Sequence, residues 1–183
     1  DGKVSPDNDR VILGNVQPDF TYGFNSQMSY KNFEFSFFIQ GTYGNDILNA
    51  SSITNTMDYG FGLNMPKSVY ENHWTPDRTN ADYPRISRST PVKMSSRFIE
   101  DGSYLRLSNV TVGYSLPEDM LAKTKFISKV RIYATINNLF TITGYSGYDP
   151  EANTRRTSPL TPGVDYAAYP RSRFFLTGIN VTF

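Results

Sequence analysis

Five stretches of the sequence alternate apolar and polar residues with a period of two, and each does so over an unusual length. Such alternation predicts a β-strand with one apolar face and one polar face. The five stretches lie at about residues 20–30, 33–43, 103–116, 129–140 and 172–183. Strands of globular proteins average about 5 or 6 residues, whereas a tilted strand needs about 9–11 residues to cross a bilayer. The pattern therefore predicts an all-β chain whose strands are long enough to span a membrane.

The second stretch shows the two faces most clearly. Phe33, Phe35 and Phe37 fall on one face, whereas Glu34 and Ser36 fall on the other. In an outer-membrane barrel the outward-facing apolar side chains contact lipid and the inward-facing ones are polar. We therefore expect the phenylalanine face to contact lipid.

The connections between the stretches are unequal in length. Residues 31–32 form a minimal turn and residues 117–128 a compact one, but the other connections are long and polar. Bacterial outer-membrane barrels alternate in this way between short periplasmic turns and long extracellular loops. The extracellular loops are thus expected at about residues 1–19, 44–102 and 144–171. Because lipid does not tolerate the unpaired edges of a five-stranded sheet, these strands are expected to be part of a larger barrel.

Composition excludes several classes of function. The 183 residues include 13 Tyr and 13 Phe, but only 19% are charged, which is below the share of about 25% that is usual in soluble domains. The net charge of +1 gives no reason to expect nucleic acid as a partner. The absence of Cys excludes disulfides and thiol chemistry, and a single His disfavours a transition-metal site. No catalytic constellation is recognisable, so an enzyme is not expected.

A soluble β-sandwich is the alternative to a barrel, because alternating aromatic strands also build sandwiches. Such a chain would be a glycan-binding module that uses its Tyr and Trp side chains. The two interpretations differ in solubility. A sandwich buries its phenylalanine face and purifies without detergent, whereas barrel strands aggregate or need detergent.

Several longer runs carry more information than the alternation does. They are FEFSFFIQGTYGN at 33–45, HWTPDRTNADYPR at 73–85, DGSYLRLSNVTVGYSLP at 101–117 and NNLFTITGYSGYDPE at 137–151, flanked by Gly14-Asn15 with Pro18 and by Pro170-Arg171. In this order and spacing the runs resemble the C-terminal end of the SusC/RagA-type TonB-dependent outer-membrane transporters of Bacteroidetes. The resemblance covers nearly the whole chain.

The resemblance implies a fold and a set of partners. The chain would supply the C-terminal antiparallel strands of a large transmembrane β-barrel, about five strands of an expected twenty-two or so. A plug would close the barrel, and TonB would act through an N-terminal part that is not in this chain. A SusD-like surface lipoprotein would take part in importing oligosaccharides or peptides. Outer-membrane lipid and the barrel assembly machinery are the other expected partners. No cofactor is expected, with calcium left open for the full-length protein.

Candidate substrate-binding residues cluster in the longest loop. Aromatic faces suit sugar rings or apolar side chains, and guanidinium groups suit carboxylates or hydroxyls. The candidates are Tyr70, His73, Trp74, Tyr83, Arg85 and Arg88. The alternative is that the motif at 73–85 only packs the loop into a fixed shape, with Trp74 buried and Arg85 bonded to backbone carbonyls.

A weak calcium site is the hypothesis for the first residues. Asp1, Asp7 and Asp9 lie in a run that looks like the end of a calcium loop, in which spaced carboxylates supply the oxygen ligands. Members of the family often carry a fuller acidic repeat at this place. The alternative is an acidic turn in an external loop.

The last residue carries a separate hypothesis. Phe183 is an aromatic residue at the end of an alternating stretch. It resembles the signal by which the outer-membrane assembly machinery recognises its clients. The alternative is an ordinary lipid-facing Phe in the periplasmic aromatic girdle.

Overall fold

The computed structural model describes residues 5, 9–57, 62, 64–87, 94–122, 126–151 and 162–183. The chain divides into two compact units. The strand unit comprises Pro18–Tyr43, Ser103–Gly144 and Pro170–Phe183, and the loop unit comprises Asp1–Gln17, Gly44–Gly102 and Tyr145–Tyr169. None of the helices in the described part of the chain has the length and apolar character needed to cross a membrane.

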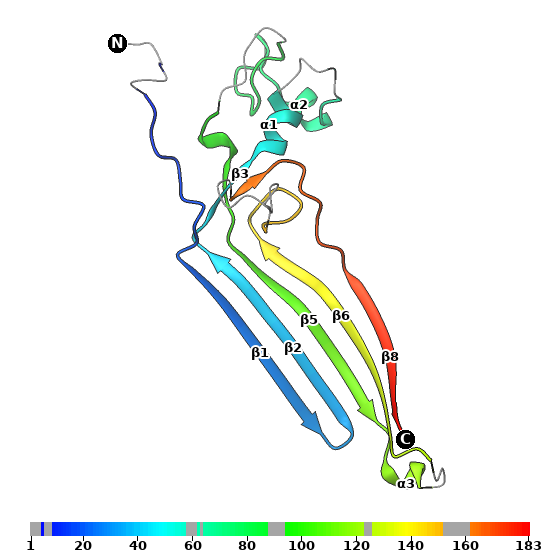
Figure 1. Cartoon of the computed structure of the whole chain (residues 1–183). Helices are drawn as coiled ribbons and strands as arrows, with labels where there is room; N and C mark the ends of the chain where they lie inside the picture. Colours follow the sequence, from blue (N-terminus) through cyan, green and yellow to red (C-terminus); the bar gives the residue numbers. More distant parts are fainter. Residues whose placement is uncertain are drawn as a thin grey trace. The chain divides into compact units, whose positions relative to one another are not determined.

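The strand unit is one antiparallel sheet of five strands in the order β1-β2-β5-β6-β8 (Figure 1). The strands are β1 (Phe20–Tyr30), β2 (Phe33–Tyr43), β5 (Tyr104–Ser115), β6 (Lys129–Thr143) and β8 (Phe174–Thr182). The first two have the bounds that the alternation predicts. β6 continues beyond the predicted end at 140 to Thr143. The sheet is open, with β1 and β8 as its edge strands.

The register places most of the apolar residues of the five strands on one face of the sheet, the apolar face, with Phe38, Phe174 and Leu176 as exceptions on the other face. One row across the sheet consists of Tyr30, Phe33, Tyr114, Ile132 and Ile179. Side chains directly opposite one another on neighbouring strands share a face and pack together. A shift of one residue would send every apolar side chain of a strand to the other face, so the hydrophobic pattern fixes this register.

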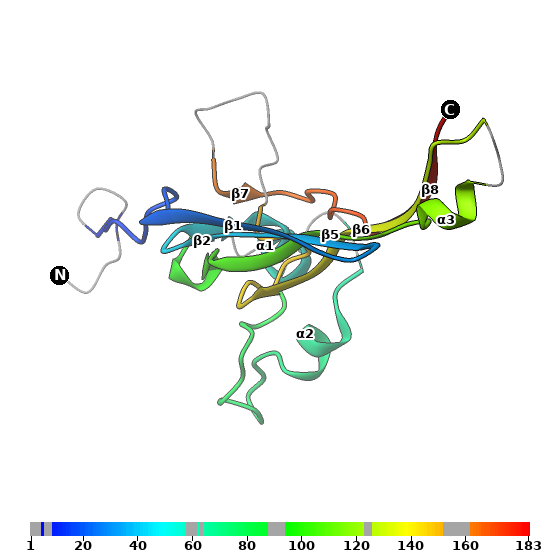
Figure 2. The same cartoon turned by 90° about the horizontal axis from the view of Figure 1, so that it is seen from below.

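The two ends of the sheet have different connections. At one end β1 turns into β2 through Lys31 and Asn32, with Lys31 in the left-handed conformation (φ 52°). At the same end β5 reaches β6 through the short helix α3 (Glu118–Leu121), which lies beside the end of β8 in both Figure 1 and Figure 2. The long connections leave the sheet at the opposite end. Short and long connections therefore alternate as the sequence predicts.

Gly41 allows a tyrosine to cross a strand on the apolar face. The ring of Tyr22 on β1 lies over Gly41 on β2, where an added Cβ would meet the ring at 2.5 Å. The Tyr22 hydroxyl donates a hydrogen bond to the Tyr104 carbonyl oxygen on β5 at 2.9 Å. This contact links two strands that are not neighbours in the sheet.

Gly113 has the same role on the opposite, polar face. The Arg131 guanidinium of β6 passes beside Gly113 of β5, within 3.0 Å of the place where a Cβ would be. It reaches the carboxylate of Glu34 on β2, with Nε 2.8 Å from Oε2. The polar face thus contains an ion pair that spans three strands.

The loop unit is folded, although the sequence predicts only loops there. Its small sheet has the order β4-β3-β7, and its strands are β3 (Asp46–Asn49), β4 (Ile99–Asp101) and β7 (Val164–Asp165). Its helices are α1 (Ala50–Met57), α2 (Lys67–Glu71) and the 3-10 helix η1 (Ser96–Phe98). Ile47, Val69 and Phe98 form its core, each with 1% or less of its surface exposed. These strands have two to four residues, which is too short for alternation to reveal them.

Candidate functional site

The candidate binding site is a pocket of about 480 Å³ in the loop unit. We call it the arginine pocket, and its lining residues are Met57, Trp74, Ala81, Asp82, Tyr83, Pro84, Arg85 and Arg97. Three of the six predicted substrate-binding residues, Trp74, Tyr83 and Arg85, are brought together here. A pocket that joins aromatic rings with a few polar groups is the usual form of a small-molecule site.

The backbone of the 73–85 motif builds one wall of this pocket. The Trp74 N–H donates to the Tyr83 carbonyl oxygen at 2.8 Å, and the Tyr83 N–H donates to the Asn72 carbonyl oxygen at 3.2 Å. The motif therefore does shape the loop. However, the expectation of a buried Trp74 is wrong, because 37% of its surface is exposed. Arg85 is exposed too, and it bonds to no carbonyl among the residues that the structure describes.

Charges in the arginine pocket do not cancel. The Arg97 guanidinium lies over the Tyr83 ring, 4.9 Å from its centroid, as a cation–π pair. The second guanidinium belongs to Arg85. Asp82 is the acidic residue of the lining, and its carboxylate accepts a hydrogen bond from the Asn72 side-chain amide. The pocket thus has two cations against one carboxylate that is already hydrogen-bonded.

The other predicted residues lie elsewhere. The His73 Nδ1 is 2.6 Å from the Tyr70 carbonyl oxygen, and the two rings are 6.0 Å apart. Neither residue lines the arginine pocket. Arg88 lies outside the described residues. Arg97 was missed by the prediction: it follows the motif, beside the buried Phe98, and no sequence pattern marks it.

A separate polar cluster stabilises the loop unit. The Tyr145 hydroxyl donates to Asp165 Oδ2 at 2.6 Å, and Asn49 Nδ2 donates to Glu100 Oε1 at 2.8 Å. Glu100 also accepts from the backbone N–H and the hydroxyl of Ser146. Burial raises the pKa of the Tyr145 phenol, and its hydrogen bond to Asp165 raises it further. Because these groups bond to one another, the pocket of about 280 Å³ beside them is better explained as structure than as a ligand site.

Known proteins resemble this chain along nearly its whole length, although no family model matches it. The TonB-dependent receptor P3 of Formosa agariphila is 41% identical over 179 residues, which cover 96% of this chain and 17% of the receptor. The TonB-dependent receptor SusC of Bacteroides thetaiotaomicron is 33% identical over 178 residues, 96% of this chain and 16% of SusC. A structure of the RagAB peptide transporter matches with a TM-score of 0.84 and 29% identity, over 99% of this chain and 19% of that one.

The chain belongs to the TonB-dependent receptors of the SusC and RagA type. It spans less than a fifth of the length of the relatives named above. Their names describe receptors and a transporter rather than enzymes. The resemblance that the motifs of the sequence indicate is therefore confirmed.

Family membership also decides between a barrel and a sandwich. A sandwich buries the inner face of its sheet, but Phe24, Phe33 and Ile179 on the apolar face are 57%, 56% and 65% exposed. The sheet of this receptor segment is a set of antiparallel strands from a large transmembrane barrel, as the sequence predicts. Within the described part of this chain nothing covers the exposed side chains of its apolar face, so in the full-length receptor this face is expected to contact lipid.

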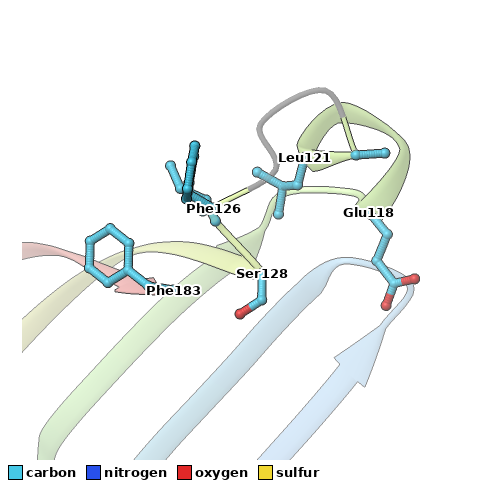
Figure 3. A pocket seen from close by; sticks show the side chains of 7 residues that line it. Glu118, Leu121, Phe126, Ser128 and Phe183 are labelled. Atoms are coloured by element: carbon cyan, nitrogen blue, oxygen red, sulfur yellow. The ribbon is translucent and has the colours of Figure 1, made fainter.

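Phe183 follows the last residue of β8 and lines a pocket of about 420 Å³ beside α3. Figure 3 shows the Phe126 side chain between the Phe183 ring and Leu121, with the Glu118 carboxylate directed away from them. Phe183 is 86% exposed. An exposed terminal ring is compatible with recognition by the assembly machinery and with a place in the aromatic girdle, so both roles stay predictions.

The calcium hypothesis falls mostly outside the described part of the receptor segment, because Asp1 and Asp7 are not among its residues. Asp9 is described, and its Oδ2 accepts a hydrogen bond from the Ser5 N–H at 2.6 Å. Where the structure describes the chain, no group of three or more His, Cys, Asp or Glu side chains could hold a metal ion. A calcium site in the full-length receptor stays a prediction.

Proposed function

We propose that this chain is part of an outer-membrane importer of oligosaccharides or peptides, in which it supplies five strands of the barrel wall and an extracellular binding unit. TonB would provide the energy, and a SusD-like lipoprotein would capture nutrient at the cell surface. The observation that carries the proposal is the match of 96% or more of the chain both to TonB-dependent receptors and to the RagAB peptide transporter.

The apolar face supports the placement in a membrane. Its exposed aromatic and aliphatic side chains run across all five strands, which is the arrangement of a lipid-facing barrel wall. The residues of the opposite face are mostly polar and include the ion pair between Arg131 and Glu34. Water or a plug inside a barrel suits such a face.

The position of the connections supports an extracellular loop unit. Both long segments that form most of this unit leave the sheet at the end opposite the short turns. In bacterial barrels the long loops are extracellular. Loops held by a rigid scaffold are also where binding residues are concentrated, which agrees with an arginine pocket in this unit.

The test uses the full-length gene in its own bacterium. Deletion should abolish growth on one class of oligosaccharide or peptide, and the full-length gene should restore it. A tagged receptor extracted from outer membranes with detergent should co-purify with a surface lipoprotein, identified by mass spectrometry. Unchanged growth on every nutrient, together with a receptor found in the soluble fraction, would contradict the proposal.

A further inference from the structure

The described lining of the arginine pocket has two guanidinium groups and one carboxylate, so it carries a net positive charge. Arg85 and Arg97 have no carboxylate partner within the described ranges, and Asp82 is engaged by the Asn72 amide. An unpaired guanidinium binds an anion strongly, because its planar fork of N–H donors matches the two oxygens of a carboxylate. The charge balance of the pocket therefore favours an anionic ligand.

The shape of the lining restricts the ligand further. Trp74 presents a partly exposed indole, and the Tyr83 ring is covered on one side by Arg97. An indole face suits the flat apolar side of a sugar ring. A free peptide would bring an ammonium group as well as a carboxylate and so would carry no net charge through its ends, whereas the described lining has two guanidinium groups against the single carboxylate of Asp82.

From this combination we infer that the arginine pocket binds an acidic sugar unit, with its ring on Trp74 and its carboxylate on Arg85 and Arg97. This inference rests on the proposed function, since it names the nutrient class that the importer would select. Arg97 has a double role in it: the guanidinium contacts the carboxylate, and its stacking on Tyr83 holds it in place.

The experiment measures binding to the full-length receptor in detergent by isothermal titration calorimetry. The probes are an oligogalacturonate and the same oligomer with its carboxylates reduced to hydroxymethyl groups. A third probe is a short peptide with a free C-terminal carboxylate. The wild-type receptor should bind the oligogalacturonate roughly tenfold to a hundredfold more tightly than the reduced oligomer, the range expected for charge-assisted hydrogen bonds.

Variants of the receptor then show whether this difference in affinity comes from the arginine pocket. Arg97→Gln and Arg85→Gln should each weaken oligogalacturonate binding by roughly tenfold or more and leave binding of the reduced oligomer unchanged. Lys67→Gln is the matched control, because it removes one positive charge from an exposed position of α2 outside the pocket. It should leave both affinities unchanged. The comparison of the two oligomers on the wild type needs no variant, so it stands even if a variant does not fold.

Three outcomes would overturn the inference: equal affinity for both oligomers, equal effects of Arg97→Gln and Lys67→Gln, or tight binding of the peptide alone. A growth experiment distinguishes failure of the acidic-sugar inference from failure of the proposed function. A receptor that still supports growth on a neutral nutrient but does not bind oligogalacturonate overturns only the acidic-sugar inference. A receptor whose deletion affects growth on no nutrient overturns the proposed function as well.

Discussion

The strand unit and the loop unit bury different kinds of side chain. In the loop unit the most buried large side chains, Ile47, Val69 and Phe98, are apolar. In the strand unit the most buried large side chain is Arg106, which is 2% exposed and donates from Nε to the Thr141 hydroxyl at 2.9 Å. Meanwhile many large apolar side chains of the sheet, Phe24, Phe33 and Ile179 among them, are exposed. The loop unit therefore has an apolar core of its own, whereas the strand unit exposes much of its apolar surface and buries an arginine.

This contrast follows from the surroundings that each unit is built for. The hydrophobic effect stabilises a unit in water by burying its apolar surface within the fold. In a bilayer the apolar surface can face lipid, and what must be satisfied internally is every backbone hydrogen-bonding group. The inner strands β2, β5 and β6 satisfy those groups by ladders on both sides, whereas β1 and β8 are paired on one side only. The loop unit buries apolar surface in its own core. Five predictions test whether this division is correct.

The largest effect is expected from a charge on the apolar face at the middle of β2. Phe37→Lys puts a charge where lipid is expected, which costs about 2–4 kcal/mol near the bilayer midplane. Ser36→Lys is the matched control, because its side chain lies on the polar face of the same strand. We expect Phe37→Lys alone to reduce the yield of heat-modifiable full-length receptor in outer membranes. Equal yields of the two variants would show that the faces are assigned wrongly.

The next effect tests the backbone packing of the sheet. A Cβ at Gly41 would lie 2.1 Å from the Tyr104 carbonyl oxygen and would also meet the Tyr22 ring. Gly41→Ala should therefore separate β2 from β5 locally and destabilise the barrel by about 1–3 kcal/mol, as other overpacked sites do. The readout is the urea midpoint of the full-length receptor in lipid vesicles.

Gly23→Ala is the control for that substitution. Its nearest neighbour would be the Phe38 ring at 3.4 Å, which is ordinary contact. It should change the midpoint little. If both alanine variants unfold at the wild-type urea concentration, the close approach at Gly41 does not exist in the assembled barrel.

The difference between the long strands of the sheet and the short strands of the loop unit explains which elements the sequence predicts. The alternation in β1 and β2 covers 11 residues each, so period and bounds are both readable. A bulge between Leu107 and Asn109 was not predicted, because one extra residue leaves the alternation on each side intact. The loop-unit sheet was not predicted at all. β3 pairs with segments that lie far away in the sequence, and no local pattern records such pairing.

The candidate site was predicted in part for a related reason. Trp74, Tyr83 and Arg85 belong to one motif, and the motif's own backbone bonds bring them together. Arg97 comes from η1, which reaches the pocket through the tertiary fold of the loop unit. A sequence motif can therefore suggest the two aromatic residues and Arg85, but not the second guanidinium, that of Arg97.

A smaller effect should be confined to the loop unit. Tyr145→Phe removes the hydrogen bond to Asp165, which is expected to destabilise this unit by about 1 kcal/mol. Hydrogen exchange should become faster around β3 and β7 and stay unchanged in β2 and β5. Tyr148→Phe, at an exposed tyrosine, is the control. Faster exchange throughout the sheet would show that the two units unfold as one.

Alkaline pH should act on the same contact. The pKa of the folded Tyr145 phenol is raised above its ordinary value of 10.0, so above that pH the unfolded state loses this proton while the folded state keeps it. The folded state then binds more protons, and its stability falls as the pH rises. Hydrogen exchange of the wild-type loop unit should therefore accelerate above about pH 10, and this component should be absent in Tyr145→Phe. The same pH dependence in both proteins would assign the effect to other groups.

The smallest effect is expected from the ion pair between Arg131 and Glu34, and its size would show what covers the polar face. The two side chains are 25% and 35% exposed in this chain, and pairs in contact with solvent contribute about 0–1 kcal/mol. A double-mutant cycle with Glu34→Gln and Arg131→Gln in the full-length receptor should give a coupling in this range that weakens as salt is added. A coupling of several kcal/mol that is insensitive to salt would mean that the pair is shielded from water in the complete barrel. In that case the polar face would be covered by protein such as a plug. Both units would then have a face buried against protein, and they would differ only in where that protein comes from.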